Sequence, residues 1–229
     1  EDNCESLGSS YKNKFLGTFG DFSTFSFYYS HQLTAGEGGM IVCKRFKDYK
    51  LLQVLRAHGW DREIKKTENT FNFINQGFNL RPLEVSAAIG LNQLKRLKMM
   101  IKVRKKNRDN IIKAMKASLK WKDQYSFFEG NKYLKPSWFS LPLLINKKYL
   151  SKKKMFLRYL KNKKIETRPI ISGNFVNQPC IALHNIKYNK NKLKNSEEID
   201  KRGFFIGLPT KLLKNKSIQT LVNILLDLK

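Results

Sequence analysis

The chain has three histidines, His31, His58 and His184, and histidine is the side chain best suited to act as a general acid or base at neutral pH. A histidine can also bind a metal ion, but these three show no fixed metal-ligand spacing, and we expect no metal site. A single histidine in a loop is more often an ordinary polar residue than a catalyst. The residues around each histidine are therefore needed to identify which of the three is catalytic.

A glycine cluster follows His31 and is the second feature with chemical potential. Gly36-Glu37-Gly38-Gly39 is neither a dinucleotide-binding fingerprint nor a P-loop, and both a hairpin turn and a functional loop remain open. The cysteines Cys4, Cys43 and Cys180 are scattered and lack CxxC spacing. We therefore expect reduced thiols, with neither a disulfide framework nor a zinc site.

The elements that must position these residues can be predicted from composition and periodicity. Aromatic and β-branched residues over 22–29 and the run 40–43 predict two strands around the glycine cluster. A helix over 48–58 ends at Gly59, and a long helix begins at Pro82 and continues to about Met115. Its residues Leu83, Ala87, Leu91 and Leu94 recur at helical spacing and predict a buried stripe.

The last hundred residues alternate strands with helices, which predicts a compact α/β lobe. Strands are expected at 139–145, 165–171 and 204–206. One helix should follow Ser151 as its N-cap, and the closing helix should follow Ser217 as its N-cap. The apolar face of the closing helix comprises Ile218, Leu221, Val222 and Leu225.

The formal charge of +27 is typical of proteins that bind nucleic acids or anionic membranes. Most of this charge is lysine spread along segments that alternate with Asn and Ile, such as 152–154, 161–164 and 187–194. This distribution favours a solvated surface over an arginine-rich groove with stacking aromatic residues. A nucleic-acid-binding module remains an alternative, and its binding would depend steeply on salt.

Targeting signals are not visible in the sequence. It has no apolar run of about 18 residues, and Glu1 is not followed by a basic and then apolar signal-peptide pattern. We therefore expect a cytoplasmic protein that does not insert into a membrane. We also expect that an N-terminal portion is missing from the chain.

Several short segments, taken together in their order along the chain, identify a protein family more specifically than any one of them alone. They are Glu1-Asp2-Asn3-Cys4-Glu5, Gly17-Thr18-Phe19-Gly20-Asp21, Phe25-Ser26-Phe27-Tyr28, Gly36-Glu37-Gly38-Gly39, Arg56-Ala57-His58-Gly59-Trp60, Gly77-Phe78-Asn79-Leu80-Arg81, Ile165-Glu166-Thr167-Arg168-Pro169 and Gly203-Phe204-Phe205-Ile206-Gly207. This series resembles the DegT/StrS sugar aminotransferases, which are fold-type-I enzymes that use pyridoxal 5'-phosphate (PLP).

The resemblance implies roles for residues near the cofactor. Asp2 matches the carboxylate that pairs with the pyridine nitrogen of PLP, where an anion keeps that nitrogen protonated. Ser26 matches a phosphate-binding hydroxyl, and Glu5 and Ser30 fall among the other cofactor contacts. Asn79 matches a residue that reaches the cofactor phosphate of the neighbouring subunit, which implies a homodimer. Without the family order, these would be ordinary chain-end, strand and turn residues.

One departure from the aminotransferases is informative. The family places a lysine about five residues after the serine, whereas this chain has His31 there. Histidine has no primary amine and cannot form the Schiff base with PLP, but it can transfer protons. Ser30-His31, followed by His58, resembles the subgroup typified by GDP-4-keto-6-deoxymannose 3-dehydratase. That subgroup often has a second histidine where this chain has Gln32.

The subgroup implies a deoxysugar-forming reaction. His31 would be the catalytic base, His58 an acid or hydrogen-bond donor to the leaving hydroxyl, and Glu166 and Arg168 contacts to the substrate. The expected function is a dehydratase that removes the 3-hydroxyl of a nucleotide-linked 4-keto-6-deoxy sugar, for glycans such as lipopolysaccharide. PLP and pyridoxamine 5'-phosphate (PMP) would be the cofactors, with an amino donor such as glutamate.

Two other functions are compatible with the sequence. The protein could be a nucleotide-sugar aminotransferase that uses a distant lysine, or a catalytically dead homologue. A related group of 3-dehydratases uses an iron–sulfur cluster, which three dispersed cysteines do not favour. The resemblance implies an α/β fold of the aspartate aminotransferase type. Residues 1–80 would be the C-terminal part of the large domain, 81–117 a connecting helix and 118–229 the small C-terminal domain, and this fragment alone would be inactive.

Overall fold

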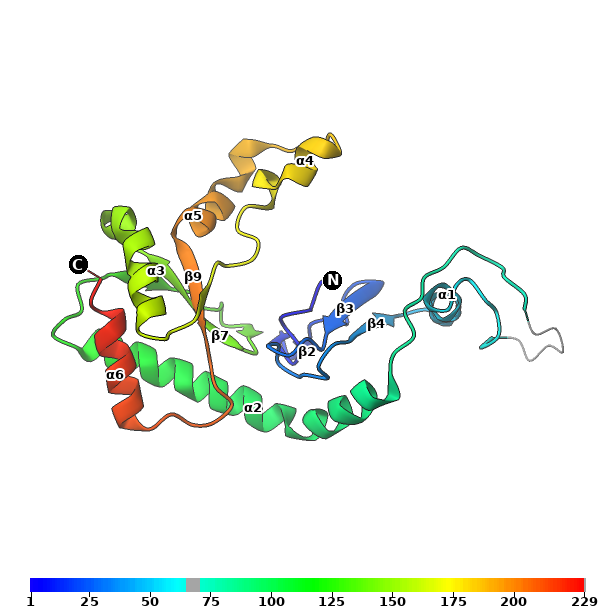
Figure 1. Ribbon diagram of the computed structural model, residues 1–229, viewed down its shortest axis with the longest axis horizontal. Coiled ribbons are helices and arrows are strands. Elements are labelled where there is room, and N and C mark those ends of the chain that lie inside the picture. The colour runs from blue at the N-terminus through cyan, green and yellow to red at the C-terminus, as the bar shows by residue number, and fades with distance from the viewer. Residues whose placement is uncertain (65–70, 229) are drawn as a thin grey trace. The chain divides into compact units, whose positions relative to one another are not determined.

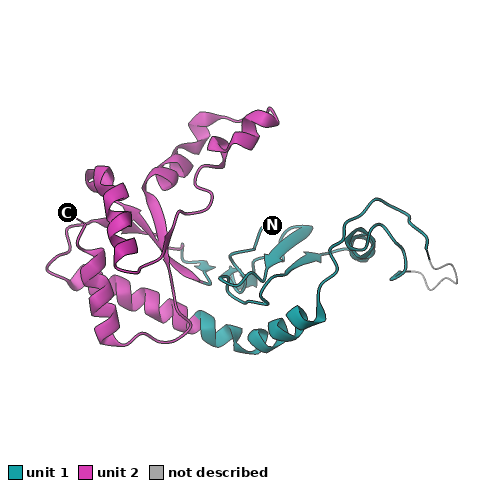
Figure 2. Cartoon of the chain, viewed as in Figure 1, with its two compact units in different colours: residues 1–101, 131–137 teal, residues 102–130, 138–229 magenta. Residues whose placement is uncertain are grey.

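The computed structural model describes residues 1–64 and 71–228 of the chain and divides it into two compact units (Figure 2). Unit 1 comprises residues 1–101 and 131–137, and unit 2 comprises residues 102–130 and 138–229. Unit 1 therefore includes a short segment whose sequence neighbours belong to unit 2.

An antiparallel hairpin in unit 1 is formed by β3 (Phe22–Ser26) and β4 (Gly39–Cys43), which are labelled in Figure 1. The predicted strands are confirmed, although the first ends at Ser26 rather than at residue 29. Backbone N–H groups of Phe27 and Ala35 donate to Gly38 and Phe27 respectively, and thereby close the base of the loop between the strands. Gly36 and Gly38 have positive φ angles, and the chain bends at Gly36 and Glu37 before β4 begins at Gly39.

A second sheet of unit 1 has the order β2-β1-β6 and joins distant parts of the sequence. It contains β1 (Ser10–Tyr11), β2 (Lys14–Phe15) and β6 (Leu134–Lys135), all antiparallel. Lys12 and Asn13 connect β1 to β2 with positive φ angles at both positions, as a tight hairpin turn requires. The third strand comes from the segment 131–137.

Two helices follow the hairpin, and the second departs from its predicted burial. α1 covers Phe46–Arg56 and α2 covers Glu84–Ala117, so α2 begins two residues after Pro82. The predicted buried stripe is wrong for the described chain, because all four of its residues, Leu83, Ala87, Leu91 and Leu94, are exposed. Helical periodicity identifies an apolar face, but it does not identify what covers that face.

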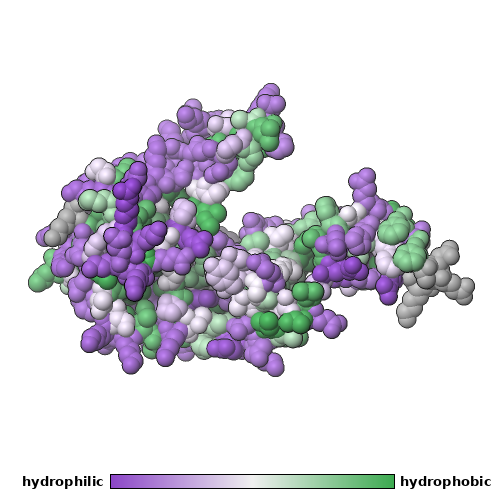
Figure 3. Space-filling view, viewed as in Figure 1, coloured by the Kyte–Doolittle hydropathy of each residue, from purple (hydrophilic) through white to green (hydrophobic). Residues whose placement is uncertain are grey.

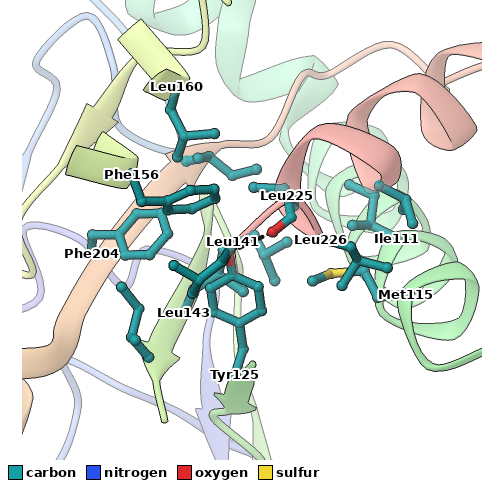
Figure 4. Packing of buried hydrophobic residues seen from close by; sticks show 14 of the residues in the cluster. Ile111, Met115, Tyr125, Leu141, Leu143, Phe156, Leu160, Phe204, Leu225 and Leu226 are labelled. Atoms are coloured by element: carbon teal, nitrogen blue, oxygen red, sulfur yellow. Dashed lines mark hydrogen bonds between the residues drawn. The ribbon is translucent and has the colours of Figure 1, made fainter. Parts of the chain in front are cut away.

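Unit 2 is built on a four-stranded antiparallel sheet of order β5-β7-β9-β8. Its strands are β5 (Tyr125–Phe127), β7 (Ser140–Ile145), β8 (Thr167–Arg168) and β9 (Gly203–Gly207). Apolar side chains of β7 and β9 pack against residues of α2, α3 (Lys153–Asn162) and α6 (Asn215–Leu225) (Figure 4). Leu141, Leu143, Leu160 and Val222 in this core have no exposed area.

The expected strands 139–145 and 204–206 are confirmed, whereas three other details of unit 2 are wrong. Ser151 is not an N-cap, because a 3-10 helix (Lys147–Lys152) capped by Asn146 runs directly into α3. Ser217 lies inside the first turn of α6, which begins at Asn215. The strand expected over 165–171 is limited to β8. The remaining elements are 3-10 helices Phe175–Asn177 and Lys190–Leu193, and helices α4 (Pro179–Leu183) and α5 (Lys194–Arg202).

Surface apolar residues are concentrated in unit 1. Met40, Ile41 and Val42 of β4 and Phe46 and Tyr49 of α1 are all exposed, and green hydrophobic residues are visible at the surface around α1 in Figure 3. Within the described residues, no helix combines the length and the apolar character that crossing a bilayer requires.

Candidate functional site

His31 lies in the loop that joins β3 to β4, and its position is fixed by contacts to the end of β3. Its backbone N–H donates to the carbonyl of Tyr28 at 3.1 Å, and the N–H of Tyr28 donates to Oγ of Ser26 at 3.2 Å. The rings of Tyr28 and His31 pack edge to face, with their centroids 5.5 Å apart. The His31 side chain is 14% exposed, so the imidazole is held in a defined and partly desolvated position.

Glu5 provides a carboxylate beside this imidazole. Nε2 of His31 and Oε1 of Glu5 are 3.8 Å apart, and the Glu5 side chain is 45% exposed. Burial raises the pKa of Glu5, a charged His31 opposes that rise, and the nearby Asp2 carboxylate adds to it. A carboxylate and an imidazole in this arrangement can orient each other and exchange a proton through a small movement.

Asp2 lies beside the start of the same strand pair as an exposed anion. Its Oδ1 accepts hydrogen bonds from the backbone N–H of Cys4 at 3.1 Å and from Oγ1 of Thr24 at 3.4 Å. Hydrogen bonds from the thiol and the backbone N–H of Cys4 lower the pKa of Asp2. This carboxylate is therefore ionised at neutral pH and can accept a hydrogen bond from a cationic ring nitrogen.

Glu1 and Asn3 anchor the two sides of Asp2, and sequence reasoning gave neither a role. The Glu1 carboxylate accepts backbone N–H groups of Gly20, Gly17 and Phe19 at 2.6, 2.8 and 2.7 Å. These bonds, with Gly20 contributing most, lower the pKa of Glu1 to about 2. Asn3 is buried and donates from Nδ2 to the hydroxyl of Ser23 at 2.7 Å. The acidic pair before a glycine-rich loop was the available signal for the Glu1 contact.

Gln32 is a third residue whose structural role was missed. Its side chain is buried, and Nε2 donates hydrogen bonds to the backbone carbonyls of Glu5 and Ser137. The resemblance implied only that a glutamine stands where the related subgroup often has histidine. Its partners could not be predicted, because Ser137 is distant in the sequence.

The two serines proposed as cofactor contacts flank the Tyr28 turn. Ser26 ends β3 opposite Gly39, and its Oγ accepts from the N–H of Tyr28. Ser30 directly precedes His31 in the same turn and is exposed. Ser26, Ser30 and His31 therefore lie close together in the sequence, at the end of β3 and in the loop that follows it.

The backbone segments that carry His58 and Asn79 pair with each other in unit 1. His58 follows α1 with a φ of 62°, and its N–H donates to the carbonyl of Phe78 at 2.9 Å. An antiparallel bridge pairs Ala57 with Asn79. Both His58 and Asn79 are exposed, so their side chains can reach groups outside this unit.

Glu166 and Arg168 belong to unit 2, whereas the other candidate residues belong to unit 1. Arg168 Nε and Nη2 donate to Oε1 of Glu166 at 2.9 and 2.8 Å. Glu166 also lines a cavity of about 620 Å³ at the end of α3. Its other lining residues are Leu157, Arg158, Lys161, Lys164, Ile165 and Thr167, so cations outnumber anions there.

Comparison with known proteins places these residues in a family context. The DegT/DnrJ/EryC1/StrS aminotransferase family matches residues 1–226. A GDP-4-keto-6-deoxy-D-mannose 3-dehydratase of Escherichia coli O55:H7 is 37% identical over 219 residues, which are 90% of this chain and 55% of that protein. The chain thus spans about half the length of that relative.

Solved structures agree with this similarity. The structure of Escherichia coli GDP-4-keto-6-deoxy-D-mannose-3-dehydratase with bound hydrated PLP has a TM-score of 0.86 and 36% identity, and covers 98% of this chain and 59% of that one. A structure of GDP-4-keto-6-deoxymannose-3-dehydratase with a trapped PLP-glutamate geminal diamine has a TM-score of 0.84 and 35% identity, and covers 97% of this chain and 59% of that one. These similarities confirm the expected fold.

Proposed function

Because the chain belongs to the DegT/DnrJ/EryC1/StrS aminotransferase family, we propose that the protein containing it is a 3-dehydratase of a nucleotide-linked 4-keto-6-deoxy sugar. It acts with PLP and PMP and takes an amino donor such as glutamate. The product is a 3-deoxy sugar for lipopolysaccharide or a similar glycan, made in the cytoplasm. Two solved structures that share this chain's fold are of dehydratases by name, one with hydrated PLP bound and one with a PLP-glutamate adduct.

The observation that carries the proposal is the histidine in the β3–β4 loop. By the resemblance, His31 stands where the aminotransferases have lysine, and its Nε2 lies 3.8 Å from Oε1 of Glu5. An aminotransferase needs a primary amine there to hold the cofactor between turnovers, whereas a proton-transferring base is sufficient for elimination.

The residues around Asp2 fit the cofactor. The low pKa of Asp2 suits a protonated pyridine nitrogen, and the hydroxyls of Ser26 and Ser30 suit a phosphate. When bound, the cofactor supplies an amine that condenses with the C4 ketone of the sugar and a ring that accepts electrons. Glu5 contacts the cofactor, and its carboxylate lies beside His31.

Each remaining side chain has a role in moving a proton or holding the substrate. His31 removes a proton from the C4′ carbon of the cofactor, and the adjacent Glu5 carboxylate stabilises the resulting imidazolium. His58 donates a proton to the leaving C3 oxygen. Glu166 and Arg168 contact the sugar nucleotide.

The reaction balances with glutamate as the reductant. The C3–O bond of the sugar breaks, and the oxygen leaves as water after protonation. Glutamate is oxidised to 2-oxoglutarate, and its nitrogen is released as ammonia when the C4 ketone is restored by hydrolysis. The sugar therefore loses one oxygen atom and keeps its C4 ketone.

Dimerisation is part of the proposal, because Asn79 is assigned to the cofactor phosphate of a second copy of the chain. The exposed position of Asn79 is compatible with such a contact. Light scattering of the full-length protein at micromolar concentration should give a dimer. A monomer that still binds cofactor tightly would refute the shared site.

The decisive experiment is incubation of the full-length protein with PLP, glutamate and GDP-4-keto-6-deoxymannose. A dehydratase releases ammonia and 2-oxoglutarate and forms a 3-deoxy-4-keto sugar, which mass spectrometry detects as the loss of one oxygen. An aminotransferase instead leaves the nitrogen on the sugar. A catalytically dead homologue forms neither product with this or any other nucleotide-linked 4-keto sugar.

A further inference from the structure

We propose that Gln32 is a positioning residue that holds the carboxylate of Glu5 beside the imidazole of His31. The kinetic part of this inference rests on the proposed dehydratase function, whereas its structural part does not. Gln32 is not assigned to contact substrate or cofactor itself.

The pair that Gln32 would hold is not supported by a shared helix or strand. Glu5 lies in the turn that precedes β1, where the N–H of Ser6 donates to the carbonyl of Asn3. His31 lies in a separate turn, which is closed by its bond to Tyr28. These local bonds shape each turn, but they do not connect one turn to the other.

The side chain of Gln32 makes that connection. Nε2 of Gln32 donates to the backbone carbonyl of Glu5, and Gln32 directly follows His31 in the sequence. Because the carbonyl and the side chain of Glu5 share one Cα atom, this hydrogen bond limits how far the Glu5 carboxylate can move from His31.

A second hydrogen bond fixes the position of the Gln32 amide itself. Nε2 also donates to the carbonyl of Ser137 at 3.0 Å, and the N–H of Ser137 donates to Oγ of Ser9 at 2.9 Å. The pairing of Ser10 with Lys135 in the β1–β6 ladder holds this segment in register. Gln32 therefore lies where three segments of unit 1 meet.

The chemistry of the carboxamide explains why a glutamine suits this position. Its NH2 group offers two donors in one plane, and it carries no charge. Gln32 is only 1% exposed, so water cannot readily replace those donors. A methionine has a similar length but cannot donate. A glutamate would place a negative charge against two carbonyl oxygens.

Kinetics of the full-length holoenzyme test the assignment. Gln32→Met should lower kcat about tenfold or more and leave KM for the sugar within about twofold, as expected when a catalytic base is misplaced. In a Glu5→Gln background the same substitution should have little further effect, because the pair is already broken. Equal losses in both backgrounds, or an unchanged kcat, would overturn the assignment.

A matched control and a second variant separate positioning from general damage. Gln53→Met replaces a glutamine in α1 whose hydrogen bond to Glu63 is exposed, and it should leave kcat unchanged. If Gln32→Met does not fold, Gln32→Asn keeps both donors on a shorter side chain. It should fold and show the same loss of kcat that depends on Glu5, and wild-type kcat in this variant would refute the role.

Crystal structures provide a readout that does not require activity. In Gln32→Met, or in Gln32→Asn if the first variant does not fold, the distance between Oε1 of Glu5 and Nε2 of His31 should exceed its wild-type value by more than about 1 Å, beyond electrostatic contact. If the wild-type protein shows no dehydration, the proposed function fails, and this distance alone decides the role of Gln32. An unchanged distance would exclude it.

Discussion

The ring of Tyr28 meets the ring of His31 edge to face, with their centroids 5.5 Å apart. The same Tyr28 accepts the backbone N–H of His31, so one residue limits both the backbone and the ring of the proposed base. A general base must approach the proton that it removes along a defined direction, and this turn fixes the orientation of the imidazole.

Replacement of His31 should separate cofactor binding from catalysis. His31→Asn in the full-length enzyme should retain PMP and lower the dehydration rate by about a hundredfold or more, the usual range for removal of a general base. His31→Lys supplies a primary amine, and borohydride should then fix the cofactor covalently to the protein. Near wild-type turnover in His31→Asn would mean that the base lies elsewhere, with His58 the next residue to test.

Gly59 after α1 should be intolerant of a side chain. Its φ is +84°, and a Cβ atom there would lie 1.7 Å from the carbonyl oxygen of Asn75. Gly59→Ala should therefore destabilise the protein by at least about 2 kcal/mol in urea unfolding. Gly36 is a matched control with φ of +82° and open space around its Cβ position. Gly36→Ala should cost only about 1 kcal/mol, and equal costs would contradict the steric explanation.

Leu160 in α3 should make a large contribution to the stability of unit 2. Its side chain is fully buried in the core, so Leu160→Ala should cost about 2 to 5 kcal/mol. Met155 in the same helix is 66% exposed, and Met155→Ala should change stability by less than about 0.5 kcal/mol. Thermal or urea unfolding measures both, and a small loss in Leu160→Ala would contradict the core shown in Figure 4.

Glu197 in α5 should contribute to stability at neutral pH and lose that contribution in acid. Hydrogen bonds from Asn174, Lys201 and Asn177 lower the pKa of Glu197 from 4.5 to about 2. A lowered carboxyl pKa in the folded state favours folding above about pH 4.5, and the benefit disappears as the pH falls towards 2. Glu197→Gln should therefore have a melting temperature that falls less steeply across this range. The same slope as wild type would refute the assignment.

Strands and helices with a strong periodic pattern were predicted well from the sequence. β3, β7 and β9 are rich in aromatic or branched apolar residues, and α6 buries Ile218, Val222 and Leu225 of its predicted apolar face. Local pattern is sufficient in these elements because aromatic and branched residues favour strands, and because the buried residues of α6 repeat at the helical period.

Elements that depend on distant partners were not predicted. β6 is only two residues long, and it exists because β1 offers a free edge to it. The same holds at the candidate site, where the family resemblance placed His31 and Glu5 among the functional residues but could not show their proximity. The roles of Gln32 and Glu1 depend on carbonyl and N–H groups of other loops, whose positions no local pattern encodes.

The segment 131–137 has a consequence for gene fusion and recombination. The chain passes between the two units after residues 101, 130 and 137, so neither unit corresponds to one uninterrupted stretch of coding sequence. A chimera that exchanged residues after 101 with those of a relative would also exchange the strand that completes the sheet of unit 1. A successful exchange would thus require that Leu134 and Lys135 still pair with β1 of the recipient protein. A strand that paired poorly would also displace Ser137, whose carbonyl accepts a hydrogen bond from Gln32.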